Sequence, residues 1–85
     1  MNCPRGRLTM KPGTRVTVTF AGKLYAGTVL VVSDSEGWYD REGRAHARRY
    51  PAKGVTTYLI PAGKALVELD EGWVQVHPTD SLKAI

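Results

Sequence analysis

The segment between residues 38 and 53 contains the side chains with the clearest capacity for binding chemistry. It interleaves aromatic rings with cations, namely Trp38, Tyr39, Arg41, Arg44, Arg48, Arg49, Tyr50 and Lys53. Aromatic rings stack on nucleic-acid bases, and cationic side chains bind phosphates. We therefore interpret this segment as a candidate surface for nucleic acid or a protein partner. A solvated loop that is charged only for solubility would have the same composition.

Residues typical of a self-contained catalytic or metal centre are sparse. The chain has no phosphate-binding P-loop, no dinucleotide-binding glycine motif and no nucleophile elbow. Its histidines, His46 and His77, fall on different predicted elements, and Cys3 is the single cysteine. Because a zinc site needs three or four ligands, no metal site is predicted. An enzyme built on this chain would have to act by positioning and electrostatics.

Composition places the chain among small basic globular domains. Its 85 residues include 12 Lys and Arg against 8 Asp and Glu, for a net charge of +4. No apolar stretch approaches the roughly 20 residues of a membrane span. The N-terminus also lacks the apolar core of a signal peptide. We expect a cytoplasmic domain without a membrane partner.

The elements that must position these residues are predicted from a period-2 pattern, which is typical of strands. Val16, Val18 and Phe20 alternate with polar residues, and Gly27 predicts a bulge or a close backbone approach. Further strands are predicted over residues 24–32, 55–60, 65–70, 73–77 and 82–85. Five to six short strands, with one 3-10 turn at 79–81 before the last strand, predict an all-β fold, a small SH3-like barrel.

The predicted organisation has a single domain. Residues 1–12 precede the first strand and are expected to form a mobile N-terminal tail. Residues 13–85 are expected to form the barrel, with an inserted basic loop at about 38–53. Within this insertion, the pattern over residues 38–50 fits either a small hairpin or an irregular excursion.

The C-terminal run Val74-Gln75-Val76-His77-Pro78, followed by Leu82, resembles a known family segment. It is similar to the Val-Gln-Ile-Tyr-Pro…Leu segment of the plasmid-borne, trimethoprim-insensitive type II dihydrofolate reductases. The stretches 13–16 and 27–29 resemble the first two strands of that family. The resemblance covers less than half of the chain.

This resemblance implies an SH3-like barrel that assembles as a homotetramer around a central pore, in which NADPH and dihydrofolate meet. It implies that Gln75 contacts both rings and that Val76 binds the cofactor carboxamide through its backbone. His77 would take the place of the family's tyrosine on the pore wall. The cofactor would thus be held by the strand residues Val74, Gln75 and Val76.

Two interpretations without catalysis compete with this one, because a fold alone does not select a function. The first is a module of the Tudor or KOW kind, which binds nucleic acid or a protein partner through the segment at 38–53. The second is a structural protein that acts as a homo-oligomer.

Overall fold

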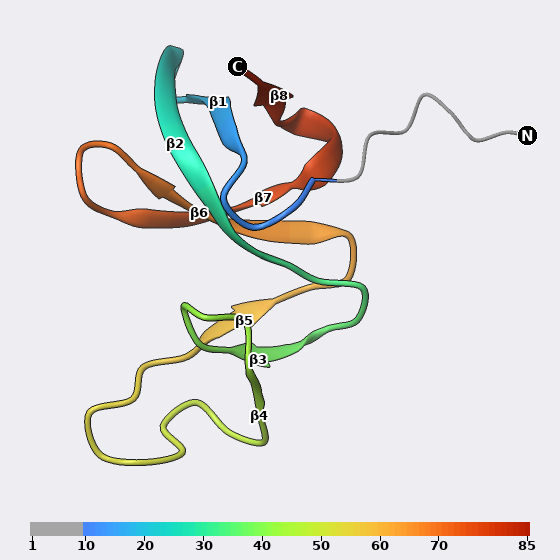
Figure 1. Cartoon of the computed structure of the whole chain (residues 1–85), viewed down its shortest axis with the longest axis vertical. Helices are drawn as coiled ribbons and strands as arrows, with labels where there is room; N and C mark the ends of the chain where they lie inside the picture. The colour runs from blue at the N-terminus through green and yellow to red at the C-terminus, as the bar shows by residue number, and fades with distance from the viewer. Residues whose placement is uncertain (1–9) are drawn as a thin grey trace, which may run out of the picture.

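The computed structural model describes residues 10–85, which form eight strands and one 3-10 turn (Figure 1). The elements in chain order are β1 (Arg15–Phe20), β2 (Lys23–Val32), β3 (Gly37–Tyr39), β4 (Ala45–His46), β5 (Tyr58–Ile60), β6 (Lys64–Leu69), β7 (Val74–Pro78), the 3-10 turn η1 (Thr79–Ser81) and β8 (Lys83–Ala84). The all-β prediction is confirmed, and so is the position of the 3-10 turn. Residues 10–85 contain no helix with the length and apolar character that a membrane crossing requires.

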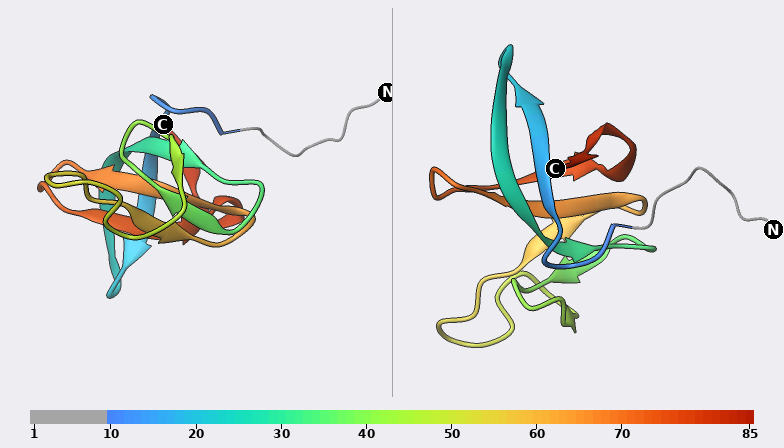
Figure 2. Two further views of the ribbon diagram at one scale, coloured as in Figure 1. Left: turned by 90° about the horizontal axis from the view of Figure 1, so that it is seen from below. Right: turned by 45° about the horizontal axis from the view of Figure 1, so that its top comes forward.

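The strands form two antiparallel sheets. The larger sheet has the order β7-β6-β2-β1-β8, and the smaller sheet has the order β4-β3-β5. The strands of the smaller sheet are inserted in the chain between β2 and β6. Strands β2 and β6 themselves are direct neighbours in the larger sheet. Figure 2 shows the insertion lying to one side of the larger sheet, at the opposite end from the β1–β2 hairpin.

Residues that the sequence assigned to a basic loop at about 38–53 are therefore partly strand. Trp38 pairs with both His46 and Leu59, so β3 is the middle strand of the smaller sheet. Strands of two or three residues are too short to show a period in the sequence. They form because a tight turn at 40–44 brings β4 back onto β3, and because β5 returns from far along the chain.

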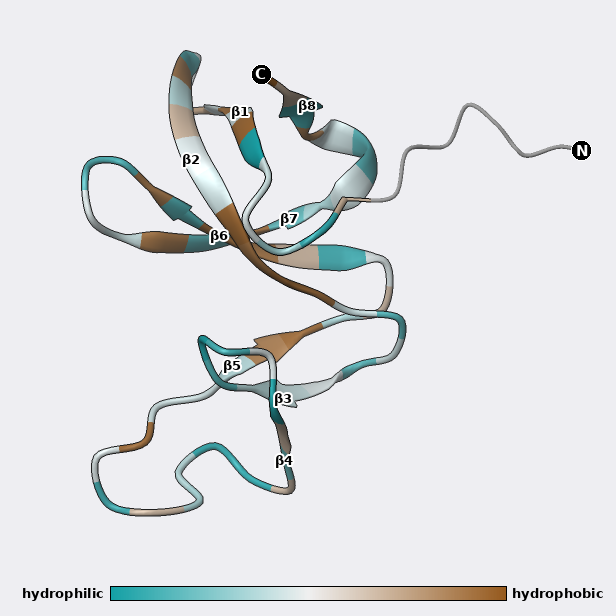
Figure 3. Ribbon diagram, in the orientation of Figure 1, coloured by the Kyte–Doolittle hydropathy of each residue, from teal (hydrophilic) through white to brown (hydrophobic). Residues whose placement is uncertain are grey.

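The apolar side chains form two clusters that meet at β6. Ala65, Val67 and Leu69 face the first cluster, with Val16 and Val18 of β1. Leu66 points to the other face, where Val31 and Ile60 complete the second cluster. Figure 3 shows this junction as hydrophobic colour on the lower half of β2 and on β5. Because β6 is buried on both faces, it reads in the sequence as a nearly continuous apolar run.

Gly27 lies where β2 crosses closest to β6. A Cβ built at this position would lie 2.7 Å from the carbonyl oxygen of Glu68 and 2.9 Å from Cγ1 of Val67. The close backbone approach is thus at Gly27, and the irregularity of the ladder lies between Val29 and Val31. Of the two alternatives that the sequence offered at Gly27, a bulge or a close approach, the structure has the close approach.

Residues 1–9 of the predicted N-terminal tail, Cys3 among them, lie outside the described residues. Met10, however, is described, and it is 8% exposed within the first cluster. The adjoining turn is fixed by hydrogen bonds from Gly13 N–H to the Val29 carbonyl and from Thr14 N–H to the Lys11 carbonyl. The domain therefore begins at least as early as Met10, because an apolar residue there fills the core.

Candidate functional site

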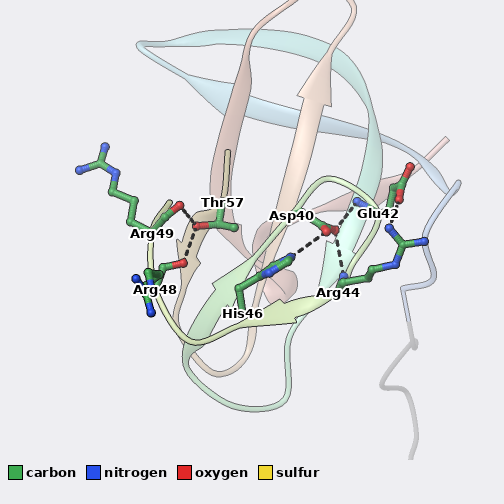
Figure 4. A network of polar contacts seen from close by, with 7 residues as sticks. All are labelled: Asp40, Glu42, Arg44, His46, Arg48, Arg49 and Thr57. Carbon is green, nitrogen blue, oxygen red and sulfur yellow. Dashed lines mark hydrogen bonds and ion pairs between the residues drawn. The ribbon is translucent and has the colours of Figure 1, made fainter. Parts of the chain in front are cut away.

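The turn between β3 and β4 is organised by the carboxylate of Asp40 (Figure 4). Its Oδ1 accepts hydrogen bonds from the backbone N–H groups of Glu42 at 2.9 Å and Arg44 at 3.0 Å. Its Oδ2 lies 2.9 Å from Nε2 of His46. These contacts, chiefly the one with His46, hold the pKa of Asp40 below its ordinary value. The turn is thus held in one conformation by a half-buried polar group.

Two of the predicted phosphate ligands have carboxylate partners within the chain. The guanidinium of Arg41 lies 2.7 Å from Glu68, and that of Arg44 lies 2.6 Å from Glu42. The hydrogen bond with Glu68 raises the pKa of Arg41. Binding of a phosphate by either arginine would have to displace an existing ion pair.

The segment from residue 47 to residue 57, here called the cationic loop, presents its cations differently. In residues 10–85 no carboxylate forms an ion pair with Arg48, Arg49 or Lys53, and all three side chains are exposed. The structure therefore separates the five predicted cations into two paired ones and three that are available to an anionic ligand.

Thr57 anchors the cationic loop to the rest of the molecule. It is only 3% exposed, and its hydroxyl lies within hydrogen-bond distance of the carbonyl oxygens of Arg48 and Arg49. In Figure 4 the side chain of Arg49 extends away from this contact, beyond the ribbon. The backbone of the arginine pair is thus fixed while the charged ends face outward.

The predicted aromatic ligands also separate into two groups. Tyr39 packs against the second cluster, and its hydroxyl donates to the Ser35 carbonyl at 2.9 Å, so its ring is not available for stacking. Trp38 lies on the opposite face of β3 beside His46 and Leu59, half-buried. Tyr50 is exposed, with the guanidinium carbon of Arg49 5.3 Å from its ring centroid. Tyr50 is therefore the ring best placed beside the free cations.

A shallow hollow of about 260 Å³ separates the Asp40 turn from the end of the cationic loop. It is lined by Asp40, Arg41, Glu42, Arg44, Gly54, Val55 and Thr56. Its walls carry two acidic and two basic side chains, and each of the four already has a partner, either in the hollow or beside it. The hollow therefore has no net preference for an anion or a cation.

The second predicted site, Val74 to His77, lies on β7 at an edge of the larger sheet. Gln75 and His77 share a face, and Oε1 of Gln75 lies 2.7 Å from Nε2 of His77. Burial lowers the pKa of His77, so its ring is neutral near pH 7. In residues 10–85 no group of His, Cys, Asp and Glu is arranged to hold a metal ion.

The direction of the backbone groups on β7 follows from the turn that precedes it. Gly72 N–H donates to the Leu69 carbonyl at 2.8 Å, and Leu69 N–H donates to the Trp73 carbonyl at 2.8 Å. This is a type I turn with a glycine bulge, and Gly72 has the positive φ of 117° that it requires. Antiparallel pairing alternates from there, so Gln75 and His77 bond to β6 while Val74 and Val76 direct their N–H and C=O groups outward.

Sequence reasoning missed Thr57 and the partners of the paired arginines. A threonine in a β-branched run carries no signal that its hydroxyl anchors a loop. Glu68 lies 27 positions from Arg41, and only the folded chain brings them together. The Asp40–Gly43 turn, in contrast, has the residue types that favour a turn.

Comparison with models of protein families, with curated proteins and with solved structures found no match to this chain.

Proposed function

We propose that this protein is a non-catalytic SH3-like module that binds nucleic acid through its cationic loop. The observation that carries the proposal is a set of three exposed cations, Arg48, Arg49 and Lys53, which have no carboxylate partner among residues 10–85. They lie on a loop that Thr57 anchors. A fixed backbone reduces the conformational entropy that these side chains lose on binding.

The SH3-like barrel is part of this proposal. It is supported by the strand order, in which β8 returns through η1 to pair with β1 while β7 ends at the other edge. In such an arrangement a long insertion in the chain between β2 and β6 leaves the pairing of the larger sheet intact. The smaller sheet is this insertion, and it carries the cationic loop.

The ligand is expected to be recognised through its phosphates rather than its bases. Three phosphate contacts predict a slope of about −2.7 in a plot of log K against log salt for duplex DNA. Tyr50 adds one exposed ring for stacking, which predicts tighter binding to single strands than to a duplex.

The test measures binding of labelled single-stranded and duplex oligonucleotides by fluorescence anisotropy over a range of salt concentrations. The variant Arg48→Glu with Arg49→Glu should weaken binding by about tenfold or more, because two phosphate contacts become repulsive. The matched control is Lys23→Glu with Lys83→Glu, which changes the net charge equally in the β1–β2 hairpin and in β8. Figure 1 shows both elements at the opposite end of the molecule from the inserted sheet. Equal losses in both variants, or no binding at about 50 mM salt, would contradict the proposal.

We propose the type II dihydrofolate reductase activity as a second candidate, on one specific observation. The outward N–H and C=O of Val76 form a donor–acceptor pair that fits a carboxamide, and Gln75 and His77 lie next to it. The proposal requires a homotetramer, with NADPH as cofactor and dihydrofolate as substrate. Strand β7 carries no cation, so the cofactor phosphates would need charge from elsewhere in the assembly.

This candidate is tested by following NADPH oxidation in the presence of dihydrofolate and trimethoprim, which silences contaminating host enzyme. Turnover should be lost in Gln75→Ala and kept in the variant with both arginines reversed. Absence of turnover from folded protein would exclude the reductase.

A further inference from the structure

We propose that β7 is a self-association edge, at which two copies of this chain pair antiparallel through Val74 and Val76 about a twofold axis beside Gln75. This interface is independent of the cationic loop, which lies on the inserted sheet. It therefore adds a partner, a second copy of the chain, that the nucleic-acid proposal does not require.

Strand β7 has unpaired backbone groups whose number and spacing suit a second copy of the same strand. Val74 and Val76 each direct one N–H and one C=O away from β6. In an antiparallel pair every second residue bonds to the neighbouring strand. Trp73 and Thr79 bond to β6 or the turn before it at the two ends of the ladder, so Gln75 and His77 also bond to β6 and the residues between them do not. Two donors and two acceptors at this spacing are self-complementary. A second copy in antiparallel orientation would satisfy all of them.

Only one register between the two copies of β7 pairs all the outward N–H and C=O groups. With Val74 opposite Val76 of the second copy, both residues exchange N–H and C=O bonds in both directions. A shift toward the C-terminus would place Val74 opposite Pro78, which has no N–H to donate. A shift toward the N-terminus would bring in Gly72, whose N–H already bonds to Leu69.

Strand β7 also lacks the charged side chains that would keep a second copy away. Exposed edge strands are commonly protected from pairing by lysines and other charges, or by being very short. Strand β8 has two residues and includes Lys83, β4 also has two residues, and β5 has three. Strand β7 has five residues, and none is charged near pH 7 because His77 is neutral. Of the edges in residues 10–85, β7 is thus the longest and carries no charge to repel its own copy.

The side chains of this register are also compatible. Gln75 faces Gln75 of the second copy, and Trp73 faces His77 of the second copy on the same side of the joined sheet. Trp73 is 48% exposed and makes an edge contact with Tyr25 at a centroid distance of 6.4 Å. An exposed indole that is already oriented would cover the neutral imidazole of the partner copy and lose its own contact with water.

The test is sedimentation velocity over a concentration series from micromolar to millimolar, with the wild-type chain and two variants. Val76→Pro removes the outward N–H without removing a bond to β6, so the fold should tolerate it. Val76→Thr keeps the backbone groups and the shape of the side chain. We expect a dimer for wild type and Val76→Thr, and a dissociation constant at least about tenfold higher for Val76→Pro.

Amide hydrogen exchange supplies a second readout that does not depend on the proline variant. The amides of Val74 and Val76 should exchange more slowly as the wild-type concentration rises, while that of Lys23 in the β1–β2 hairpin should not change. A chain that remains monomeric, exchange at Val76 that is independent of concentration, or a Val76→Pro dimer as stable as wild type would each overturn the proposal. Because one edge cannot hold both partners, NADPH bound at Val76 would dissociate this dimer, whereas an oligonucleotide bound at the cationic loop would not.

Discussion

At the scale of single residues, the candidate site depends on two polar groups that hold backbone rather than bind ligand. Thr57 anchors the carbonyls of Arg48 and Arg49, and Asp40 organises the turn between β3 and β4. Both act on segments that have few apolar contacts of their own. The positions of the charged side chains therefore depend on hydrogen bonds more than on packing.

Replacing Thr57 with Val should destabilise the protein and weaken oligonucleotide binding together. Valine keeps the shape but removes the hydroxyl, which leaves a partly buried carbonyl unpaired at a cost of about 1–3 kcal/mol. The matched control is Thr56→Val at the exposed neighbouring position, where we expect a change within about 0.5 kcal/mol. Urea unfolding followed by tryptophan fluorescence measures the free energy of unfolding of both variants, and fluorescence anisotropy measures their oligonucleotide binding. Equal changes in the two variants would show that Thr57 is not the anchor.

The contact between Asp40 and His46 predicts a contribution to stability that depends on pH. Because the folded-state pKa of Asp40 is lowered, its contribution is present above the unfolded value of about 3.9 and is lost as the pH falls through the folded value. In His46→Ala, NMR titration should show the Asp40 pKa moving up toward its ordinary range. Asp70, whose pKa is lowered by Arg15, serves as the control and should not move.

The sequence was informative about which residues are charged and poorly informative about which charges are available. The density of cations between Arg41 and Lys53 is visible without a structure, and so is the turn at Asp40–Gly43. The ion pair of Arg41 with Glu68 joins the turn between β3 and β4 to strand β6, so no local pattern could predict it. For the same reason, the exposure of Tyr50 and the burial of Tyr39 appear only in the folded chain.

At the scale of elements, the longer strands of the larger sheet were predictable, because β1 is long enough to alternate and β6 is a nearly continuous apolar run. Val16 and Val18 of β1 and the apolar run of β6 are buried as the pattern predicts, whereas Phe20, the third residue of the β1 alternation, is 46% exposed at the hairpin end. The sequence left residues 38–50 open between a small hairpin and an irregular excursion, and the structure has the hairpin, formed by β3 and β4. The pairing of β3 with β5 was not predicted, since contact between residues 37–39 and 58–60 is set by tertiary structure. The 55–60 prediction was too long at its start, because Thr57 bonds to the cationic loop instead of a strand.

The crossing of β2 over β6 predicts that Gly27 cannot be replaced. In Gly27→Ala the new methyl group would meet the Glu68 carbonyl at 2.7 Å, and overpacking of this kind costs about 1–3 kcal/mol. Gly37→Ala is the matched control, because its Cβ would meet only the Tyr39 ring at 3.4 Å and its φ is not positive. Thermal unfolding of both variants measures the difference. A Gly27→Ala protein as stable as wild type would mean that β2 and β6 do not cross so closely.

At the scale of the whole molecule, the two apolar clusters share β6 and cannot separate without exposing it. Ala65, Val67 and Leu69 belong to one cluster and Leu66 to the other, all on one six-residue strand. The inserted sheet is therefore expected to unfold together with the larger sheet rather than as a separate unit. This coupling keeps the cationic loop in place relative to the core.

Calorimetry should accordingly show one unfolding transition for the wild-type protein and for core variants. Leu66→Ala, at a fully buried position, should lower the free energy of unfolding by about 2–5 kcal/mol and shift the single transition as a whole. Leu24→Ala, at a position that is 73% exposed, should change it by no more than about 0.5 kcal/mol. Two resolved transitions in Leu66→Ala would show that the inserted sheet is an independent unit.

Whether the cationic loop is the functional surface can be measured by titrating isotope-labelled protein with a short single-stranded oligonucleotide and following the backbone amide signals by NMR. We expect the largest shifts on residues 47–57, with the Thr57 amide among them. These shifts should disappear in the variant with Arg48→Glu and Arg49→Glu. Shifts confined to β7, or no shifts at low salt, would contradict this expectation.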